Sequence, residues 1–142
     1  MLKHPQRSLA AVSIVLALLG GCGSNRITQG TAYPTNLART HTLDIQVFRR
    51  QTRIELTNTT ARSFGPSTLW LNARFSKQID GLAVGQTLEV RLRDFKDEFG
   101  ESFRGGGFLA AERSERIALA EIQPGDAKPP AMLGMVVVGE ED

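Results

Sequence analysis

The segment IDGLAVGQTLEVRL, residues 79–92, decides the fold expected for this chain. In its second half apolar and polar side chains alternate, which is the period-two pattern of a strand with one buried face. The side chains expected to face the core are Leu88, Val90 and Leu92. Gly85 lies just before this strand, where a glycine allows the chain to turn sharply. The segment therefore predicts a turn followed by a half-buried strand.

Further short strands are expected on both sides of this segment. Residues 43–47 and 54–56 alternate in the same way on either side of a short turn, which predicts a hairpin. Residues 68–75 alternate without interruption and predict a third strand. The remaining apolar runs read as strands are 108–111, 117–122 and 132–138. About seven short strands without long helices between them favour an all-β, antiparallel β-sandwich over an α/β sheet.

Residues 79–92 resemble the I-x-x-L-x-x-G-x-x-x-x-V-x-L crossing of bacterial immunoglobulin-like and fibronectin-like modules. The resemblance implies that Leu82 plugs one end of the sandwich and that Gly85 turns the chain into the next strand. It also implies that residues 41–139 form an immunoglobulin-like domain.

The N-terminus has the order of a bacterial signal peptide. Lys3 and Arg7 precede an apolar run over residues 9–19, and two small residues follow it. A helix needs about 20 apolar residues to cross a bilayer, so this run is too short for a permanent anchor. Residues 1–21 are therefore expected to be removed as a signal peptide.

The run ends in Leu19-Gly20-Gly21-Cys22, which resembles the lipobox of bacterial lipoproteins. The resemblance implies cleavage before Cys22 and attachment of fatty acyl chains such as palmitate to that cysteine, which holds the chain on a membrane. Stable attachment needs two or more membrane signals, and two acyl chains supply them. An ordinary secretory signal that leaves a free cysteine is the alternative. Gly23 stands where an inner-membrane retention signal would have Asp, which favours the outer membrane in a Gram-negative cell.

The expected organisation is completed by a tether and a tail. Residues 22–40 comprise the lipidated cysteine and a Gly-, Ser-, Asn- and Thr-rich flexible tether, and residues 140–142 form an acidic tail. Loss of Lys3 and Arg7 with the signal leaves 15 basic and 15 acidic residues. This balance gives no sign of a nucleic-acid partner, which normally meets a concentrated positive face.

The mature chain has few groups for catalysis. His41 is its only histidine, and the sequence has no nucleophile elbow, zinc-binding helix motif or phosphate loop. The acidic residues near position 97 are expected on a solvated face, since their spacing does not match a calcium loop. We therefore expect no enzyme, no cofactor and no metal site.

Candidate binding residues are aromatic or lie beside the glycine run at 105–107. They are Trp70, Phe99, Phe103 and Arg104. A further set of arginines could form a basic patch for anionic lipid head groups or glycan phosphates if strand order brought them together. This set is Arg49, Arg50, Arg53, Arg91 and Arg93, and a dispersed, solvated surface is the expected arrangement.

Two functions remain from this reading. The first is a non-catalytic, membrane-anchored binding or assembly module of the bacterial cell envelope. It would meet a partner of unknown identity, such as an envelope protein, by a sheet edge or an aromatic patch. The alternative is a small-ligand or glycan-binding lipoprotein that uses the candidate aromatic residues and the glycine run as a pocket.

Overall fold

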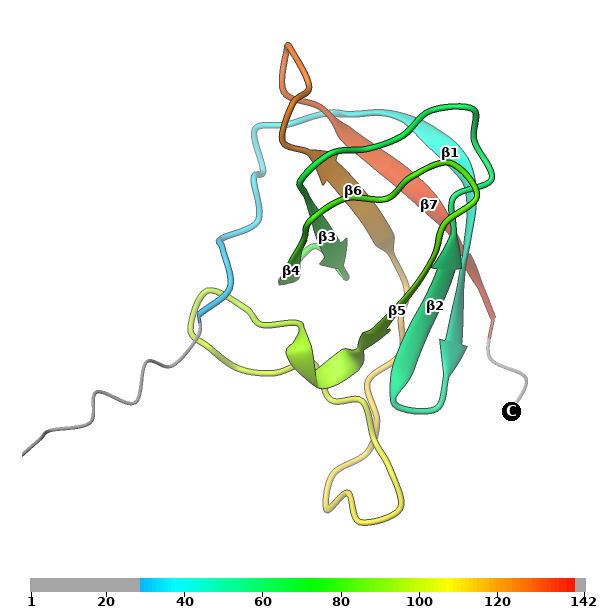
Figure 1. Ribbon diagram of the computed structural model, residues 1–142. Helices are drawn as coiled ribbons and strands as arrows, with labels where there is room; N and C mark the ends of the chain where they lie inside the picture. The colour runs from blue at the N-terminus through cyan, green and yellow to red at the C-terminus, as the bar shows by residue number, and fades with distance from the viewer. Residues whose placement is uncertain (1–28, 140–142) are drawn as a thin grey trace, which may run out of the picture.

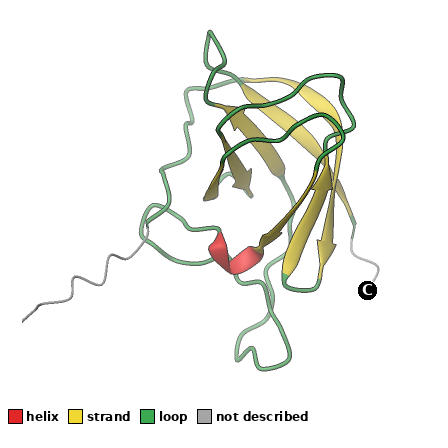
Figure 2. Ribbon diagram, in the orientation of Figure 1, coloured by secondary structure: helices red, strands yellow, loops and turns green. Residues whose placement is uncertain are grey.

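The computed structural model describes residues 29–139, and the predicted signal peptide, Cys22 and the acidic tail lie outside this range. The fold is nearly all β, as predicted, with one short 3-10 turn (Figure 2). The elements are β1 (Arg39–Arg50), β2 (Arg53–Thr57), β3 (Ser67–Leu71), β4 (Phe75–Ile79), β5 (Thr87–Arg91), the 3-10 helix η1 (Leu92–Asp94), β6 (Ala120–Pro124) and β7 (Met132–Val138).

The strands form one mixed sheet in the order β4-β3-β6-β7-β1-β2-β5. The sheet curves into a half-barrel (Figure 1). All neighbours are antiparallel except β1 and β7, which pair in parallel, so the prediction of an antiparallel sheet was wrong at this pair. These are the first and last strands, and no short connection between them dictates an antiparallel pairing.

The predicted hairpin at residues 43–56 is confirmed by β1 and β2. Val47 pairs with Leu56 across the hairpin, and both side chains are fully buried. Gln51 adopts a positive φ of 55° in the turn. The alternation of apolar and polar residues therefore indicates which face of these strands points to the core.

The single strand predicted over residues 68–75 is wrong, because this stretch contains the turn between β3 and β4. Asn72 and Ala73 have φ values of 54° and 52°, and the amide of Arg74 donates to the carbonyl of Leu71 at 3.1 Å. Leu71 pairs directly with Phe75, so three residues separate two side chains on the same face. An odd number of intervening residues preserves the period-two alternation, which hides the turn.

The strand predicted at residues 108–111 is also wrong. These residues are all exposed and belong to a loop that projects from the lower end of the domain in Figure 1. The preceding Gly106 and Gly107 have φ values of 71° and 129°, which interrupt an extended chain. The strand predicted at 117–122 begins only at Ala120, while the one at 132–138 is confirmed as β7.

The core fills the concave side of the sheet. Leu82 is completely buried, and Gly85 has a positive φ of 73°, which confirms the turn predicted before β5. Phe103 packs edge-on against Phe75 with ring centroids 5.2 Å apart. The buried cluster is Ile45, Val47, Ile54, Leu56, Phe64, Leu69, Leu71, Phe75, Leu82, Val90, Leu92, Phe95, Phe103, Ala120, Ile122, Leu133 and Met135.

The other face of β3 and β6 is covered by residues 30–39, part of the stretch expected as tether. The ring of Tyr33 meets Trp70 edge-on at 5.2 Å, and its hydroxyl donates to Glu121 at 2.9 Å. Arg39 donates to the other carboxylate oxygen of Glu121 at 2.9 and 2.7 Å. These contacts bury Trp70 on the face opposite the core and fasten this segment to the sheet.

Candidate functional site

Residues 104–115 form the most prominent projection of the domain, and we call this segment the apolar loop (Figure 1). At its end the amide of Ala110 donates to the carbonyl of Gly107 at 3.0 Å, which places Phe108 and Leu109 at the centre of a tight turn. Their side chains are 101% and 91% exposed. We call residues 108–111 the apolar tip.

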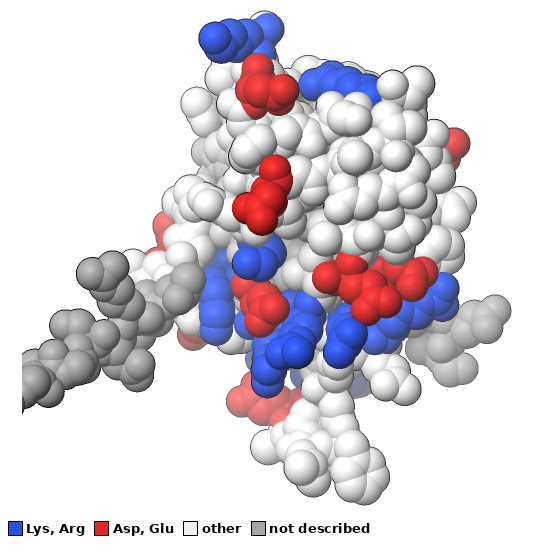
Figure 3. All heavy atoms as spheres, in the orientation of Figure 1, with Lys and Arg blue, Asp and Glu red and all other residues white. Residues whose placement is uncertain are grey.

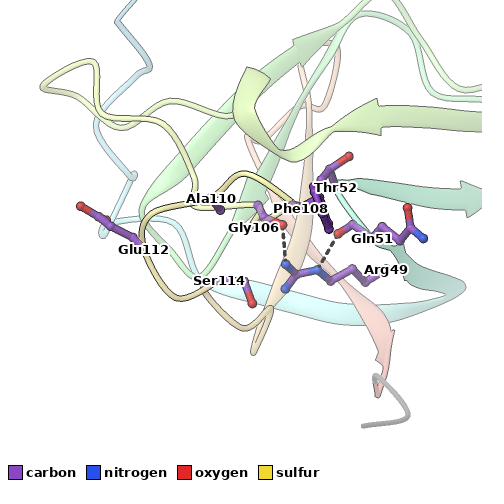
Figure 4. Close-up of a pocket in the computed structure, with 10 residues that line it drawn as sticks. Arg49, Gln51, Thr52, Gly106, Phe108, Ala110, Glu112 and Ser114 are labelled. Carbon is purple, nitrogen blue, oxygen red and sulfur yellow. Dashed lines mark hydrogen bonds between the residues drawn. The ribbon is translucent and has the colours of Figure 1, made fainter.

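The base of the apolar loop is held by hydrogen bonds. The amide of Glu115 donates to the carbonyl of Arg104 at 2.8 Å, which closes the loop. The guanidinium of Arg49 donates to the carbonyl of Gly105 at 2.8 Å (Figure 4). It also donates to the carbonyl of Glu115 at 2.7 Å, so one side chain from β1 bonds both ends of the loop. The tip is therefore presented on a fixed base.

Gly106 is required in this base by its conformation and by its neighbours. Its φ of 71° is a left-handed value that favours glycine, and a Cβ there would lie 2.8 Å from the Cβ of Ser114. The two arms of the loop can approach so closely only because residue 106 lacks a side chain.

Arginines from β2 and from the end of β5 gather beside this base. Arg53 pairs directly with Arg91 across the two strands, and both line a pocket of about 320 Å³ together with Arg93. Thr52, Gly105 and Gly106 complete its lining, and we call it the arginine pocket. The expectation of a dispersed arrangement is wrong for Arg53, Arg91 and Arg93, because the β2–β5 register brings Arg53 beside Arg91. Arg49 and Arg50 do not line this pocket.

The arginine pocket carries positive charge that is only partly neutralised. Arg53 forms an exposed ion pair with Glu89 at 3.0 Å. Among residues 29–139, Arg91 and Arg93 take part in no ion pair. Figure 3 shows basic side chains gathered across the lower part of this face, with acidic groups among them, directly above the projecting loop. The apolar tip thus extends beyond a belt rich in arginine.

Two further pockets border these elements. One of about 680 Å³ lies against the apolar loop and is lined by Arg49, Gln51, Thr52, Gly105, Gly106, Gly107, Phe108, Ala110, Glu112 and Ser114 (Figure 4). The other, of about 550 Å³, lies between the edge strands β4 and β5 and includes Lys77, Gln78, Glu89 and Arg91. Charged groups line both pockets, and the first is also lined by Phe108 and Ala110 of the apolar tip.

The four candidate binding residues from the sequence are not brought together. Trp70 and Phe103 are each 1% exposed, on opposite faces of the sheet, while Phe99 is 73% exposed in a separate turn. Arg104 lies at the base of the apolar loop, 3.5 Å from Glu112 and 3.9 Å from Glu115. Of the four, only Arg104 belongs to the site that the structure presents.

The turn that carries Phe99 is organised by a buried carboxylate, that of Asp97. The other acidic residues of this cluster, Asp94, Glu98 and Glu101, are exposed, as expected. Asp97 accepts from the amides of Phe99 at 3.0 Å and Glu101 at 2.8 Å, and from Arg74 at 2.7 Å. Burial acts to raise the pKa of Asp97, but the hydrogen bonds from Arg74 and from these amides outweigh it and hold the pKa below 3.8. Asp97 is thus an ionised structural group.

Residues 29–139 offer few other groups that could take part in catalysis. His41 is exposed, with its Nδ1 3.2 Å from the hydroxyl of Thr40. Between residues 29 and 139 no group of three or more acidic, histidine or cysteine side chains is arranged to hold a metal ion. Within the same range no helix has the length and apolarity needed to cross a bilayer.

Phe108 and Leu109 were not predicted as site residues, because residues 108–111 were expected to form a strand. The available signal was the run Gly105-Gly106-Gly107 directly before two large apolar residues, since three glycines favour a loop over a strand. Comparison with protein families, curated proteins and solved structures found no match for this chain.

Proposed function

We propose that the chain is a non-catalytic binding module of the bacterial cell envelope, anchored to a membrane by lipid on Cys22. The order of basic residues, apolar run and Leu19-Gly20-Gly21-Cys22 supports export and lipidation. Gly23 after the cysteine supports placement in the outer membrane of a Gram-negative cell. The proposed binding surface is the end of the domain that carries the apolar loop.

The observation that carries the binding role is the exposure of Phe108 and Leu109 on a fixed base. Each exposed apolar side chain forgoes about 1.5–3 kcal/mol of burial free energy. A loop that only connected β5 to β6 would have no need of these residues, nor of the hydrogen bonds from Arg49 that hold its base. Apolar groups that project from a fixed base are typical of contact sites.

The lipid anchor is tested by labelling cells that express the protein with a radioactive fatty acid. The wild type is expected to carry label and to sediment with membranes, and Cys22→Ser is expected to lose the label. Label on the Cys22→Ser protein, or none on the wild type, contradicts the lipidation proposal.

The binding surface is tested by placing a photo-crosslinking amino acid at single exposed positions in intact cells. Leu109 in the apolar tip is compared with Val84, an apolar residue that is 53% exposed on another turn. Crosslinks to one class of molecule at position 109 and none at 84 are expected. Equal crosslinking at both positions would remove the apolar loop as the binding surface.

A small-ligand or glycan-binding lipoprotein is the second candidate, and the pocket of about 550 Å³ between β4 and β5 favours it. Lys77 and Gln78 on one edge and Glu89 on the other offer hydrogen-bond donors and acceptors to a polar ligand. A glycan array probed with the wild type and with Gln78→Ala tests this alternative, which requires binding that the substitution weakens.

We also propose that the half-barrel is related to immunoglobulin-like domains. The burial of Leu82 and the turn at Gly85 support this relationship. A two-layer sandwich arrangement in an experimental structure is its test.

A further inference from the structure

We propose that the apolar loop docks onto an anionic phospholipid surface, with the apolar tip inserted among the lipids and the arginine pocket holding lipid phosphates. This inference rests on the proposed function, because it assigns the partner of the binding surface. It commits to the membrane that carries the lipid anchor as that partner.

The shape of the apolar tip fits insertion better than contact with a protein. A stable protein interface buries about 800 Å² on each partner and needs a broad complementary surface. The tip offers only two large apolar side chains, Phe108 and Leu109, at the end of a narrow turn. A projection of this kind can place its side chains at the boundary between head groups and acyl chains without any matching surface.

The arginine pocket supplies the charge that a lipid surface requires. A guanidinium binds phosphate through two parallel hydrogen bonds, and Arg91 and Arg93 are exposed and form no ion pair within residues 29–139. Gly105 and Gly106 line the same pocket and also form the base of the apolar loop. The phosphate-binding groups therefore lie where the head groups would be if the tip were inserted.

The described chain begins beside residues 95–103, the stretch that connects η1 to the apolar loop. Gly30 is fixed by a hydrogen bond from its amide to the carbonyl of Asp97 at 2.8 Å, in the segment that follows η1 (Figure 1). Six residues lie between Cys22 and Gln29, so the seven Cα–Cα steps of a fully extended chain would span roughly 25 Å. A lipid on Cys22 would thus keep the apolar loop close to the bilayer, where a weak second contact is effective.

The test measures binding of an unlipidated mature chain, residues 22–142 with Cys22→Ser, to vesicles by co-sedimentation. This chain retains every residue of the buried core. One set of vesicles is pure phosphatidylcholine. The other is phosphatidylcholine in which about one lipid in three is replaced by anionic phosphatidylglycerol. Circular dichroism confirms that each variant is folded.

The wild type is expected to bind the anionic vesicles and to bind the neutral ones much more weakly. Phe108→Ser with Leu109→Ser should weaken binding about tenfold or more. Arg91→Gln with Arg93→Gln should weaken it roughly twentyfold and remove the preference for anionic lipid. Val84→Ser is the matched control and should bind like the wild type.

Absence of binding to anionic vesicles, or binding unaffected by the Phe108 and Leu109 substitutions, would overturn the docking proposal. Crosslinking of position 109 to a protein in place of lipid would do the same. Neither result contradicts lipidation of Cys22 if the wild-type protein carries fatty-acid label in cells. Conversely, vesicle binding by a chain that carries no label in cells supports docking and contradicts the anchor.

Discussion

At the scale of single residues, Glu121 connects the sheet to the segment that leads toward the proposed anchor. Its side chain is 1% exposed and accepts from Tyr33 and Arg39. Gly134 makes room for this contact, because a Cβ at that position would lie 3.1 Å from the Cδ of Arg39. Glu121 is therefore the residue on which the attachment of residues 30–39 depends.

Glu121→Gln should lower the free energy of unfolding by about 1–2 kcal/mol, because a charge-assisted hydrogen bond in a buried site is lost. Arg39 is 43% exposed at its side chain, so its charge stays hydrated and the loss stays moderate. Urea unfolding followed by circular dichroism measures the change. The control is Glu55→Gln, whose ion pair with Arg50 is exposed and contributes about 0–1 kcal/mol. Equal losses in the two variants would argue against a special role for Glu121.

Asp97 makes stability depend on pH in the acid range. Its pKa in the folded chain lies below 3.8, so the stabilisation is present above the unfolded value and is lost as pH falls through the folded pKa. Asp97→Asn should destabilise the protein near neutral pH, and its difference from the wild type should shrink below about pH 4. Urea unfolding at a series of pH values tests this, and a difference that does not change with pH would contradict it.

At the scale of elements, the apolar loop depends on Gly106. Gly106→Ala should lose about 1–2 kcal/mol through its positive φ, and more through the contact with Ser114. Gly85→Ala is a matched control, because Gly85 has nearly the same φ, 73°, and no atom within 4 Å of its Cβ position. Unfolding experiments on both variants should show the larger loss at position 106. A loss at 106 no larger than at 85 would mean that the base of the loop relaxes freely.

The strands were predictable where one face is buried and a recognisable turn separates them. Residues 43–56 are of this kind, and so is the turn at Gly85. Residues 132–138 were predictable instead from a continuous apolar run, and the first four of them are buried. The turn at Asn72 and Ala73 was hidden because Leu71 and Phe75 remain in phase across it. The parallel pairing of β1 with β7 leaves no mark in the sequence, since strand order depends on contacts between distant segments.

The candidate site was only partly predictable for a related reason. Arg104 and the glycine run were recognised, but convergence of Arg53 with Arg91 requires the β2–β5 register. Apolar composition alone suggested that residues 108–111 were a strand, although they have no partner strand and lie in solvent. Conversely, Trp70 is buried under Tyr33, and nothing local to residue 70 indicates that contact.

At the scale of the whole molecule, the buried core and the proposed binding surface occupy different parts of the half-barrel. The core lies inside the curved sheet, while the apolar loop projects from the lower end of the domain in Figure 1. The base of this loop also lines the arginine pocket, and the described chain begins beside the turn that carries Asp97. This arrangement would let the proposed lipid anchor and the proposed docking loop act on the same membrane surface. We therefore expect the domain to have one orientation on its membrane, with the apolar loop toward the lipid.

That orientation is tested most directly by the emission of a tryptophan placed at the apolar tip. Phe108→Trp and the control Val84→Trp are each reconstituted, with lipid on Cys22, into anionic vesicles that contain brominated phospholipids. Trp70 is 1% exposed and contributes a constant background. Emission from the tryptophan at position 108 is expected to shift to the blue and to be quenched by bromine. Emission from the tryptophan at position 84 is expected to be the same with vesicles as in water. Equal emission and equal quenching at the two positions would contradict that orientation.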